Sequence, residues 1–148
     1  MEREILFRGK RVDNGEWVEG YYSAEEFNPM TCKIEHIPRI QQLGSCASYG
    51  IELSTVGQFT GLTDKNGVKI FEGDIVRLDN RSPEGSWTAV VEFGNPNGTY
   101  SWGYQLKLIG GDEGFNSGIL LWIEMEETGA TCEVIGNIHD NPEMTKEK

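Results

Sequence analysis

Short apolar runs, separated by turns rich in glycine and asparagine, recur along the whole chain. The first turn signal, Asp13-Asn14-Gly15, lies between an apolar run at 5–8 and a second run at 17–22. Asparagine and glycine tolerate the positive φ angles of tight hairpin turns, so this pattern predicts an N-terminal β-hairpin. Similar turn signals follow at 64–67 and 95–98. The other apolar runs predict strands at 32–36, 51–53, 56–59, 68–71, 75–78, 88–93, 100–109 and 132–138.

Polar stretches between these runs predict loops. Residues 23–30 are polar and end in Asn28-Pro29, and residues 41–50 show no hydrophobic period, so both predict loops. Pro38 lacks a backbone N–H and should end a strand or confine it to an edge. Length alone leaves 119–125 open between a strand and a short buried helix. Many short strands with close turns are typical of an all-β barrel or sandwich.

The charge of the chain limits its partners. Lysine and arginine total 13 and aspartate and glutamate total 24, which gives a formal charge of −11. A net anion repels nucleic acid at long range, so the charge disfavours direct DNA or RNA binding without excluding it. An acidic surface fits solubility or docking onto a basic protein partner better. We expect no membrane span, because the longest apolar run is 119–123, and no signal peptide, and therefore a cytoplasmic protein.

No motif for catalysis, metal binding or cofactor binding stands out. The histidines, His36 and His139, lie in no cluster with metal-ligand spacing. The three cysteines, Cys32, Cys46 and Cys132, form no CxxC pair and predict free thiols rather than a disulfide framework. No serine or cysteine has a catalytic signature around it, and the paired carboxylates fit exposed loops and strand ends. We therefore expect no catalytic residue, no metal and no cofactor.

Three segments, in order along nearly the whole chain, carry a resemblance to a known family. The opening segment runs from Phe7-Arg8-Gly9-Lys10-Arg11 to Gly20-Tyr21. The middle segment, 55–76, includes the stretch Gly61-Leu62-Thr63-Asp64-Lys65-Asn66-Gly67, and the closing segment is 134–143. These segments resemble the YopX-like proteins of phages and prophages. The resemblance implies no established function and no catalytic residues, and it implies a C-terminal barrel similar to the SH3 type.

The resemblance and the strand pattern together predict the organisation of the chain. An N-terminal β-hairpin region should occupy residues 1–60 and an SH3-like β-barrel residues 61–140. A polar tail should follow at 141–148, where Pro142 can begin one helical turn. The fold class predicted is all-β.

Aromatic residues are the remaining candidates for a binding surface. SH3-type barrels bind peptides through grooves lined by aromatic side chains. Tyr100, Trp102 and Tyr104 are spaced by two and would share one face of a strand, and Trp17 lies in the N-terminal hairpin. The alternative, which the pattern favours, is that this face is simply the core. A small basic spot of Arg8, Lys10 and Arg11 also lies beside Phe7 and Trp17, and there a solvated strand face is the favoured interpretation.

Three hypotheses for function follow. The first is a non-catalytic phage or prophage accessory protein that binds a host or phage protein partner. The second is a nucleic-acid-binding small barrel, against which the charge of −11 counts. The third is an enzyme of a class that the sequence does not identify. Exposed strand edges leave self-association open as well.

Overall fold

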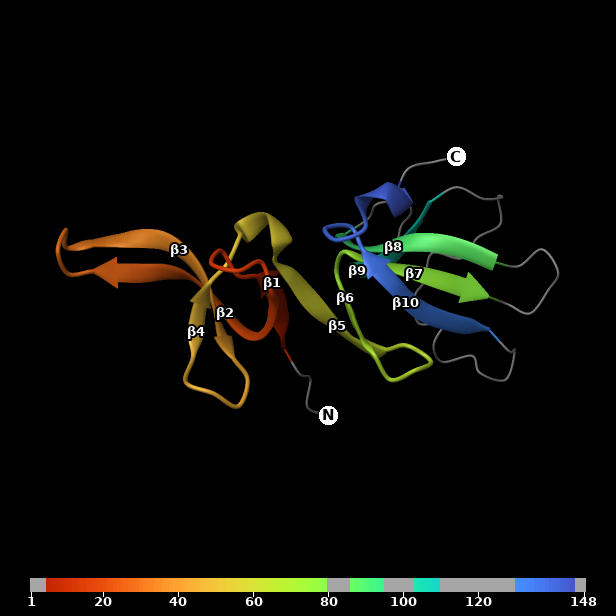
Figure 1. The fold of residues 1–148 in the computed structure, drawn as a ribbon, viewed down its shortest axis with the longest axis horizontal. Coiled ribbons are helices and arrows are strands. Elements are labelled where there is room, and N and C mark those ends of the chain that lie inside the picture. Colours follow the sequence, from red (N-terminus) through yellow and green to blue (C-terminus); the bar gives the residue numbers. More distant parts are fainter. Residues whose placement is uncertain (1–4, 80–85, 95–102, 110–129, 146–148) are drawn as a thin grey trace. The chain divides into compact units, whose positions relative to one another are not determined.

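The structure is a computed structural model that describes residues 5–79, 86–94, 103–109 and 130–145. Its described elements are ten β-strands and two short 3-10 turns, which confirms the all-β prediction (Figure 1). The chain divides into two compact units, Met1–Phe59 and Thr60–Lys148. The formal charge divides unevenly between them: six Lys and Arg against nine Asp and Glu give −3 in the first unit, and seven against fifteen give −8 in the second.

The first unit is an antiparallel sheet in the order β4-β3-β2-β1-β5. A 3-10 turn at Leu53–Thr55 precedes β5, which continues past the end of the unit. The strands of this sheet are β1 (Phe7–Lys10), β2 (Trp17–Asn28), β3 (Lys33–Gln42), β4 (Ser48–Gly50) and β5 (Gly57–Thr63).

The predicted N-terminal hairpin is confirmed. Strands β1 and β2 pair antiparallel, with Lys10 opposite Trp17. Gly15 has a φ of 72°, and its N–H donates to the Arg11 carbonyl at 2.9 Å. The turn forms where local sequence predicts it, because glycine takes a positive φ without strain.

The predicted loop at 23–30 is wrong over most of its length, whereas the one at 41–50 is confirmed at 43–47 and wrong at its two ends, which belong to β3 and β4. Strand β2 continues to Asn28, and β3 continues to Gln42. Pro38 lies inside β3, yet it does so where the pairing register with β2 shifts between Ser23 and Glu25. A bulge leaves a residue without a ladder partner, so the missing N–H of Pro38 is tolerated there. Cross-strand pairing thus overrides the polar composition that predicted a loop.

The core of the first unit consists of Val18, Ile40 and Ile51, with Phe7 and Tyr22 packed against it. Alternation along β1 and β2 sends Phe7 and Val18 to this face and Arg8 and Trp17 to the other.

Gly20 allows β2 and β3 to approach each other closely. A Cβ atom at this position would lie 1.8 Å from the carbonyl oxygen of Gln41 in β3. Real Cβ atoms do not come this close to backbone, so any side chain at this position would push the two strands apart.

The second unit contains a four-stranded antiparallel sheet in the order β10-β7-β8-β9. The last strand of the chain therefore lies beside β7 rather than beside β9. The sheet is preceded by β6 (Lys69–Phe71), which follows β5 through the Asp64–Gly67 turn, and the chain ends in a 3-10 turn at Pro142–Thr145. The strands of this sheet are β7 (Asp74–Asp79), β8 (Ser86–Gly94), β9 (Gly103–Leu108) and β10 (Thr131–Asn137).

Two buried aspartates close the turns of the second unit. Asp64 accepts hydrogen bonds from the N–H groups of Asn66, Val68 and Val134, at 2.8, 2.9 and 2.9 Å. Asp74 accepts one from the N–H of Phe71 at 2.7 Å. The first set ties the β5–β6 turn to β10, so a turn predicted from local sequence also joins segments 70 residues apart.

Apolar side chains from the first and the last strands of the second unit pack together in its core. It contains Ile70, Val76, Leu78, Ala89, Val91, Leu106 and Cys132.

The predicted SH3-like barrel is not confirmed, because the two sheets are not closed over the described residues. Barrel closure depends on pairing between distant strands, which local patterns do not encode. Within the described ranges, no helix is long and apolar enough to cross a membrane.

Candidate functional site

Trp17, one of the four predicted binding residues, lies under two cations on one face of the first unit. The Arg8 guanidinium carbon is 4.7 Å from the centre of the Trp17 ring, and the Lys10 ammonium nitrogen is 5.4 Å from it. Both distances allow a cation–π interaction. Two of the three residues of the predicted basic spot therefore lie beside Trp17, while Phe7 points to the other face. We call this group the cation–tryptophan cluster (Arg8, Lys10 and Trp17).

Arg11, the third residue of the predicted basic spot, is engaged elsewhere. Its guanidinium stacks 3.8 Å from the centre of the Tyr49 ring and donates to both carboxylate oxygens of Asp13, at 2.9 and 2.6 Å. These bonds hold the pKa of the Asp13 carboxyl below its ordinary value and raise the pKa of the guanidinium. Arg11 thus stabilises the β1–β2 turn rather than extending the cluster.

Tyr104, another predicted binding residue, lies in the second unit. It is opposite Phe93 in the β8–β9 ladder, with ring centres 5.0 Å apart and an interplanar angle of 62°. Tyr104 is half-buried and packs against the core, while Phe93 is 55% exposed. Trp17 and Tyr104 therefore belong to different units. Tyr100 and Trp102 lie outside the described residues, and the proposed aromatic groove stays a prediction.

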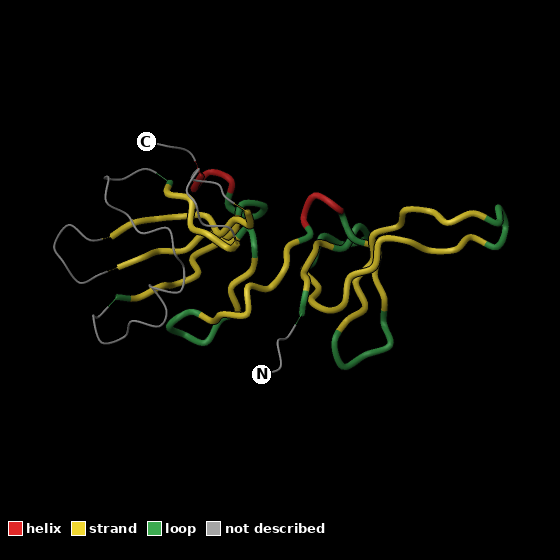
Figure 2. The backbone as a smooth tube through the Cα atoms, turned by 180° about the vertical axis from the view of Figure 1, so that it is seen from behind, coloured by secondary structure: helices red, strands yellow, loops and turns green. Residues whose placement is uncertain are grey.

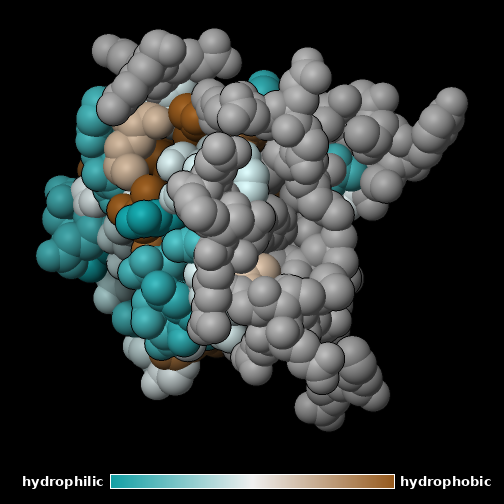
Figure 3. All heavy atoms as spheres, turned by 90° about the vertical axis from the view of Figure 1, so that its right-hand side faces the viewer, coloured by the Kyte–Doolittle hydropathy of each residue, from teal (hydrophilic) through white to brown (hydrophobic). Residues whose placement is uncertain are grey.

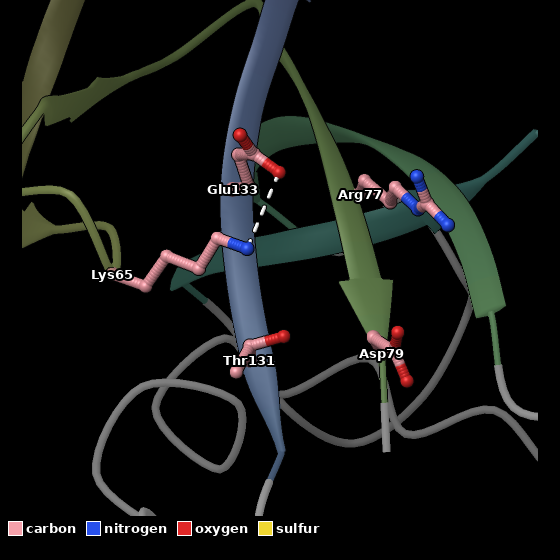
Figure 4. Close-up of a pocket in the computed structure, with 5 residues that line it drawn as sticks. All are labelled: Lys65, Arg77, Asp79, Thr131 and Glu133. Atoms are coloured by element: carbon pink, nitrogen blue, oxygen red, sulfur yellow. Dashed lines mark ion pairs between the residues drawn. The ribbon is translucent and has the colours of Figure 1, made fainter. Parts of the chain in front are cut away.

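A small polar pocket opens on the β7–β10 face of the second unit, with a volume of about 160 Å³ (Figure 4). Lys65 Nζ lies 3.5 Å from Glu133 Oε2, and both side chains are substantially exposed. Among the described residues visible in Figure 3, hydrophilic groups lie beside smaller hydrophobic patches. Opposite charges in the pocket largely offset each other, so it has no preference for a ligand of one sign. Its lining residues are Lys65, Arg77, Asp79, Thr131 and Glu133.

The titratable residues do not converge on a reactive centre in the part of the chain that the structure describes. No group of three or more His, Cys, Asp or Glu residues gathers there that could hold a metal ion. His36 lies in β3 of the first unit and His139 follows β10 of the second. Burial raises the pKa of the Cys132 thiol to about 12, and nearby carboxylates contribute to the same shift. This thiol is therefore protonated and poorly nucleophilic at neutral pH.

An exposed apolar feature that sequence reasoning missed lies on the β2–β3 hairpin. Strand β1 pairs only with Trp17–Gly20 of β2, and β4 pairs only with Arg39–Gln41 of β3. The segment beyond them, Glu25–His36, is a two-stranded extension among the described residues (Figures 1 and 2). We call this segment the outer ribbon.

Large apolar side chains of the outer ribbon face solvent. Phe27 and Ile34 lie directly opposite each other, at 60% and 68% exposure, and Met30 in the turn is 91% exposed. Cys32, also exposed, has a φ of 56° in the same turn. The sequence signal that could have revealed the strand was the alternation of Glu26, Phe27 and Asn28, which is the period of a strand and not of a loop.

Comparison with known proteins identifies the family of the chain. A family model described as YopX protein matches residues 6–146. The chain belongs to the YopX family. No curated protein matches it. Among solved structures it is similar to protein EF1440 from Enterococcus faecalis, with 22% identity and a TM-score of 0.46, over 98% of this chain and 100% of that one.

Two of the segments of this YopX-family chain that carry the resemblance, the middle one and the closing one, have structural roles in the second unit. Asp64 in the middle segment accepts the N–H of Val134 in the closing segment. Gly73, with a φ of 89°, accepts the N–H of Ile138 through its carbonyl at 3.0 Å. These segments build turns and join strands. The candidate for a protein-binding surface lies outside these two segments, on the outer ribbon.

Proposed function

We propose that this YopX-family chain is a non-catalytic accessory protein of a phage or prophage that binds a protein partner through its outer ribbon. The observation that carries the proposal is the exposed trio of Phe27, Met30 and Ile34. All three belong to one hairpin turn and its last cross-strand pairs. Scattered exposed apolar residues need no explanation, but a cluster of large ones on a projecting element marks an interaction site.

The outer ribbon gains little stability from the pairing of its own two strands. Strand pairs without a third strand or a packed face are marginally stable in water. The ordinary solution would be polar residues on both faces of the ribbon. Instead, it exposes three side chains whose burial would each contribute about 1.5–3 kcal/mol. Such residues can contribute much of the affinity of an interface when they enter pockets of a partner.

The test is capture from a lysate of the bacterium that encodes the chain, with and without nuclease, by three forms of the full-length protein. These are the wild type, the double variant F27S/I34S, and the control V12S. Val12 is also exposed, at 64%, but lies in the β1–β2 turn rather than on the outer ribbon. Circular dichroism and thermal unfolding of each form establish that the variants remain folded.

The expected result is a nuclease-resistant partner that the wild type and V12S retain and that F27S/I34S loses. Removal of two central apolar anchors should cost about 2 kcal/mol or more, which is at least a tenfold loss of affinity. A partner retained equally by all three forms, or no partner at all, would refute the outer ribbon as a binding surface.

Nucleic-acid binding is a second candidate, favoured by the cation–tryptophan cluster. Basic residues beside an aromatic ring can bind single strands through phosphate contacts and base stacking. The overall charge of −11 opposes it. A labelled oligothymidylate, titrated against the wild type and W17A, tests it: binding that weakens steeply with salt and is lost in W17A would support this function over the first.

A further inference from the structure

We infer that the partner bound by the outer ribbon offers a cleft with an apolar wall facing Phe27 and Ile34 and a cationic wall facing Glu26 and Glu35. This inference rests on the proposed function and specifies the chemistry of its partner. It follows from the two faces of the ribbon, which carry different side chains.

Strand geometry separates these two faces. Successive side chains point to opposite sides of a strand, and directly opposite residues of two strands share a side. Phe27 is opposite Ile34, and the preceding pair, Glu26 opposite Glu35, therefore occupies the reverse side. Because this ribbon is a single two-stranded layer with exposed residues on both sides, Phe27 and Ile34 on one and Glu26 on the other, a cleft that receives it would contact both sides.

The carboxylate pair is unfavourable in the free chain. Like charges directly opposite each other on a two-stranded ladder are destabilising. Asn28 Nδ2 donates to Glu35 Oε1 at 2.9 Å, which gives one carboxylate a neutral partner. Neither Glu26 nor Glu35 forms an ion pair within the described residues. Lys33, opposite Asn28, shares the side of the two glutamates and leaves it with a net negative charge. The outer ribbon therefore combines an exposed apolar pair with a like-charge pair that one lysine only partly offsets.

A cationic group of a partner would turn the unfavourable carboxylate pair into a favourable binding site. An arginine placed between the two carboxylates can donate to both, and its planar guanidinium suits such forked recognition. The net charge points the same way, since the residues 25–36 contain three glutamates and one lysine. A second copy of this chain fits poorly, because each copy carries a charge of −11.

The experiment measures the affinity of the purified, captured partner for full-length forms of the chain at low and high NaCl concentration. E26Q and E35Q each remove one carboxylate while preserving its shape. E52Q is the matched control, because Glu52 is an exposed carboxylate of the same unit outside the outer ribbon. Thermal unfolding of each form is measured in parallel, and sedimentation of the chain alone tests for a second copy as the occupant.

E26Q and E35Q should each weaken binding about two- to fivefold, the range for one exposed charge pair. They should also lower the salt dependence of binding, while Tm stays equal or rises. A purely structural role would predict the opposite combination, with lower Tm and unchanged salt dependence. E52Q should leave both the affinity and its salt dependence at the wild-type values.

The outcomes separate the two proposals. If F27S/I34S loses the partner but E26Q and E35Q bind as the wild type does at every salt concentration, the cationic wall is refuted and the proposed function stands. If F27S/I34S binds normally, or if the lysate yields no partner, the proposed function fails and this inference fails with it. Self-association that is lost in F27S/I34S would show a second copy as the occupant and overturn the cationic cleft.

Discussion

Replacement of Asp64 by alanine should strongly destabilise the second unit. The carboxylate is 7% exposed and accepts three backbone hydrogen bonds. Two of them, from Asn66 and Val68, shape the turn between β5 and β6. The third, from Val134, joins that turn to β10. The variant removes both acceptor oxygens and therefore all three hydrogen bonds together.

The loss of unfolding free energy can be estimated from those three hydrogen bonds. Hydrogen bonds to a charged group contribute about 1.5–3 kcal/mol each. Water can reach part of this site, so the lower end applies, and D64A should lose roughly 3–5 kcal/mol of unfolding free energy. D64N keeps one oxygen for the two turn amides but turns an NH₂ group toward the Val134 N–H. It should therefore lose about 1.5–2.5 kcal/mol.

The assay has a global and a local measurement. Thermal unfolding should show a Tm lower by more than about 10 °C for D64A, with D64N between D64A and the wild type. Amide hydrogen exchange by NMR gives the local measurement, because the N–H groups of Val68 and Val134 should lose protection first. If D64A unfolds within about 0.5 kcal/mol of the wild type, the carboxylate does not hold these segments together and the reasoning is refuted.

Two further predictions concern the backbone of the first unit and the thiols. G20A should lower the unfolding free energy by about 3 kcal/mol or more, because the new Cβ would lie 1.8 Å from the Gln41 carbonyl oxygen; a wild-type denaturation curve would contradict the close approach. At pH 8 a thiol reagent should modify two cysteines in the native protein and three after denaturation. The protected one should be Cys132, which is buried with a pKa of about 12, while Cys32 and Cys46 are exposed. Rapid native modification of all three would contradict its burial.

Local chemistry made much of the fold predictable. Asp13-Asn14-Gly15 forms the predicted turn because its requirement, a residue that accepts positive φ, is met within the turn itself. The 3-10 turn that begins at Pro142 is likewise local, because proline has the φ of a first helical residue. The all-β class followed from the density of such turns along the chain.

The candidate site was less predictable because exposure is not a local property. Trp17 was correctly placed beside Arg8 and Lys10, since residues of one hairpin become neighbours through a register that its turn sets. The outer ribbon was missed because 23–30 is polar and contains Pro29, so composition predicted a loop. Whether Phe27 is buried or exposed depends on which strands flank β2, and no local pattern reports that.

The amino-acid sequence by itself determined the β class, the main turns, the acidic charge and the family, because these depend on residues close together or on the chain as a whole. Tertiary structure alone decided which strands became neighbours, where Pro38 could be tolerated, and that Asp64 reaches Val134. It also decided that Phe27 and Ile34 face solvent while Val18 and Ile40 are buried. The physical reason is that burial and long-range hydrogen bonds arise only when distant segments pack, and that packing is a property of the whole fold.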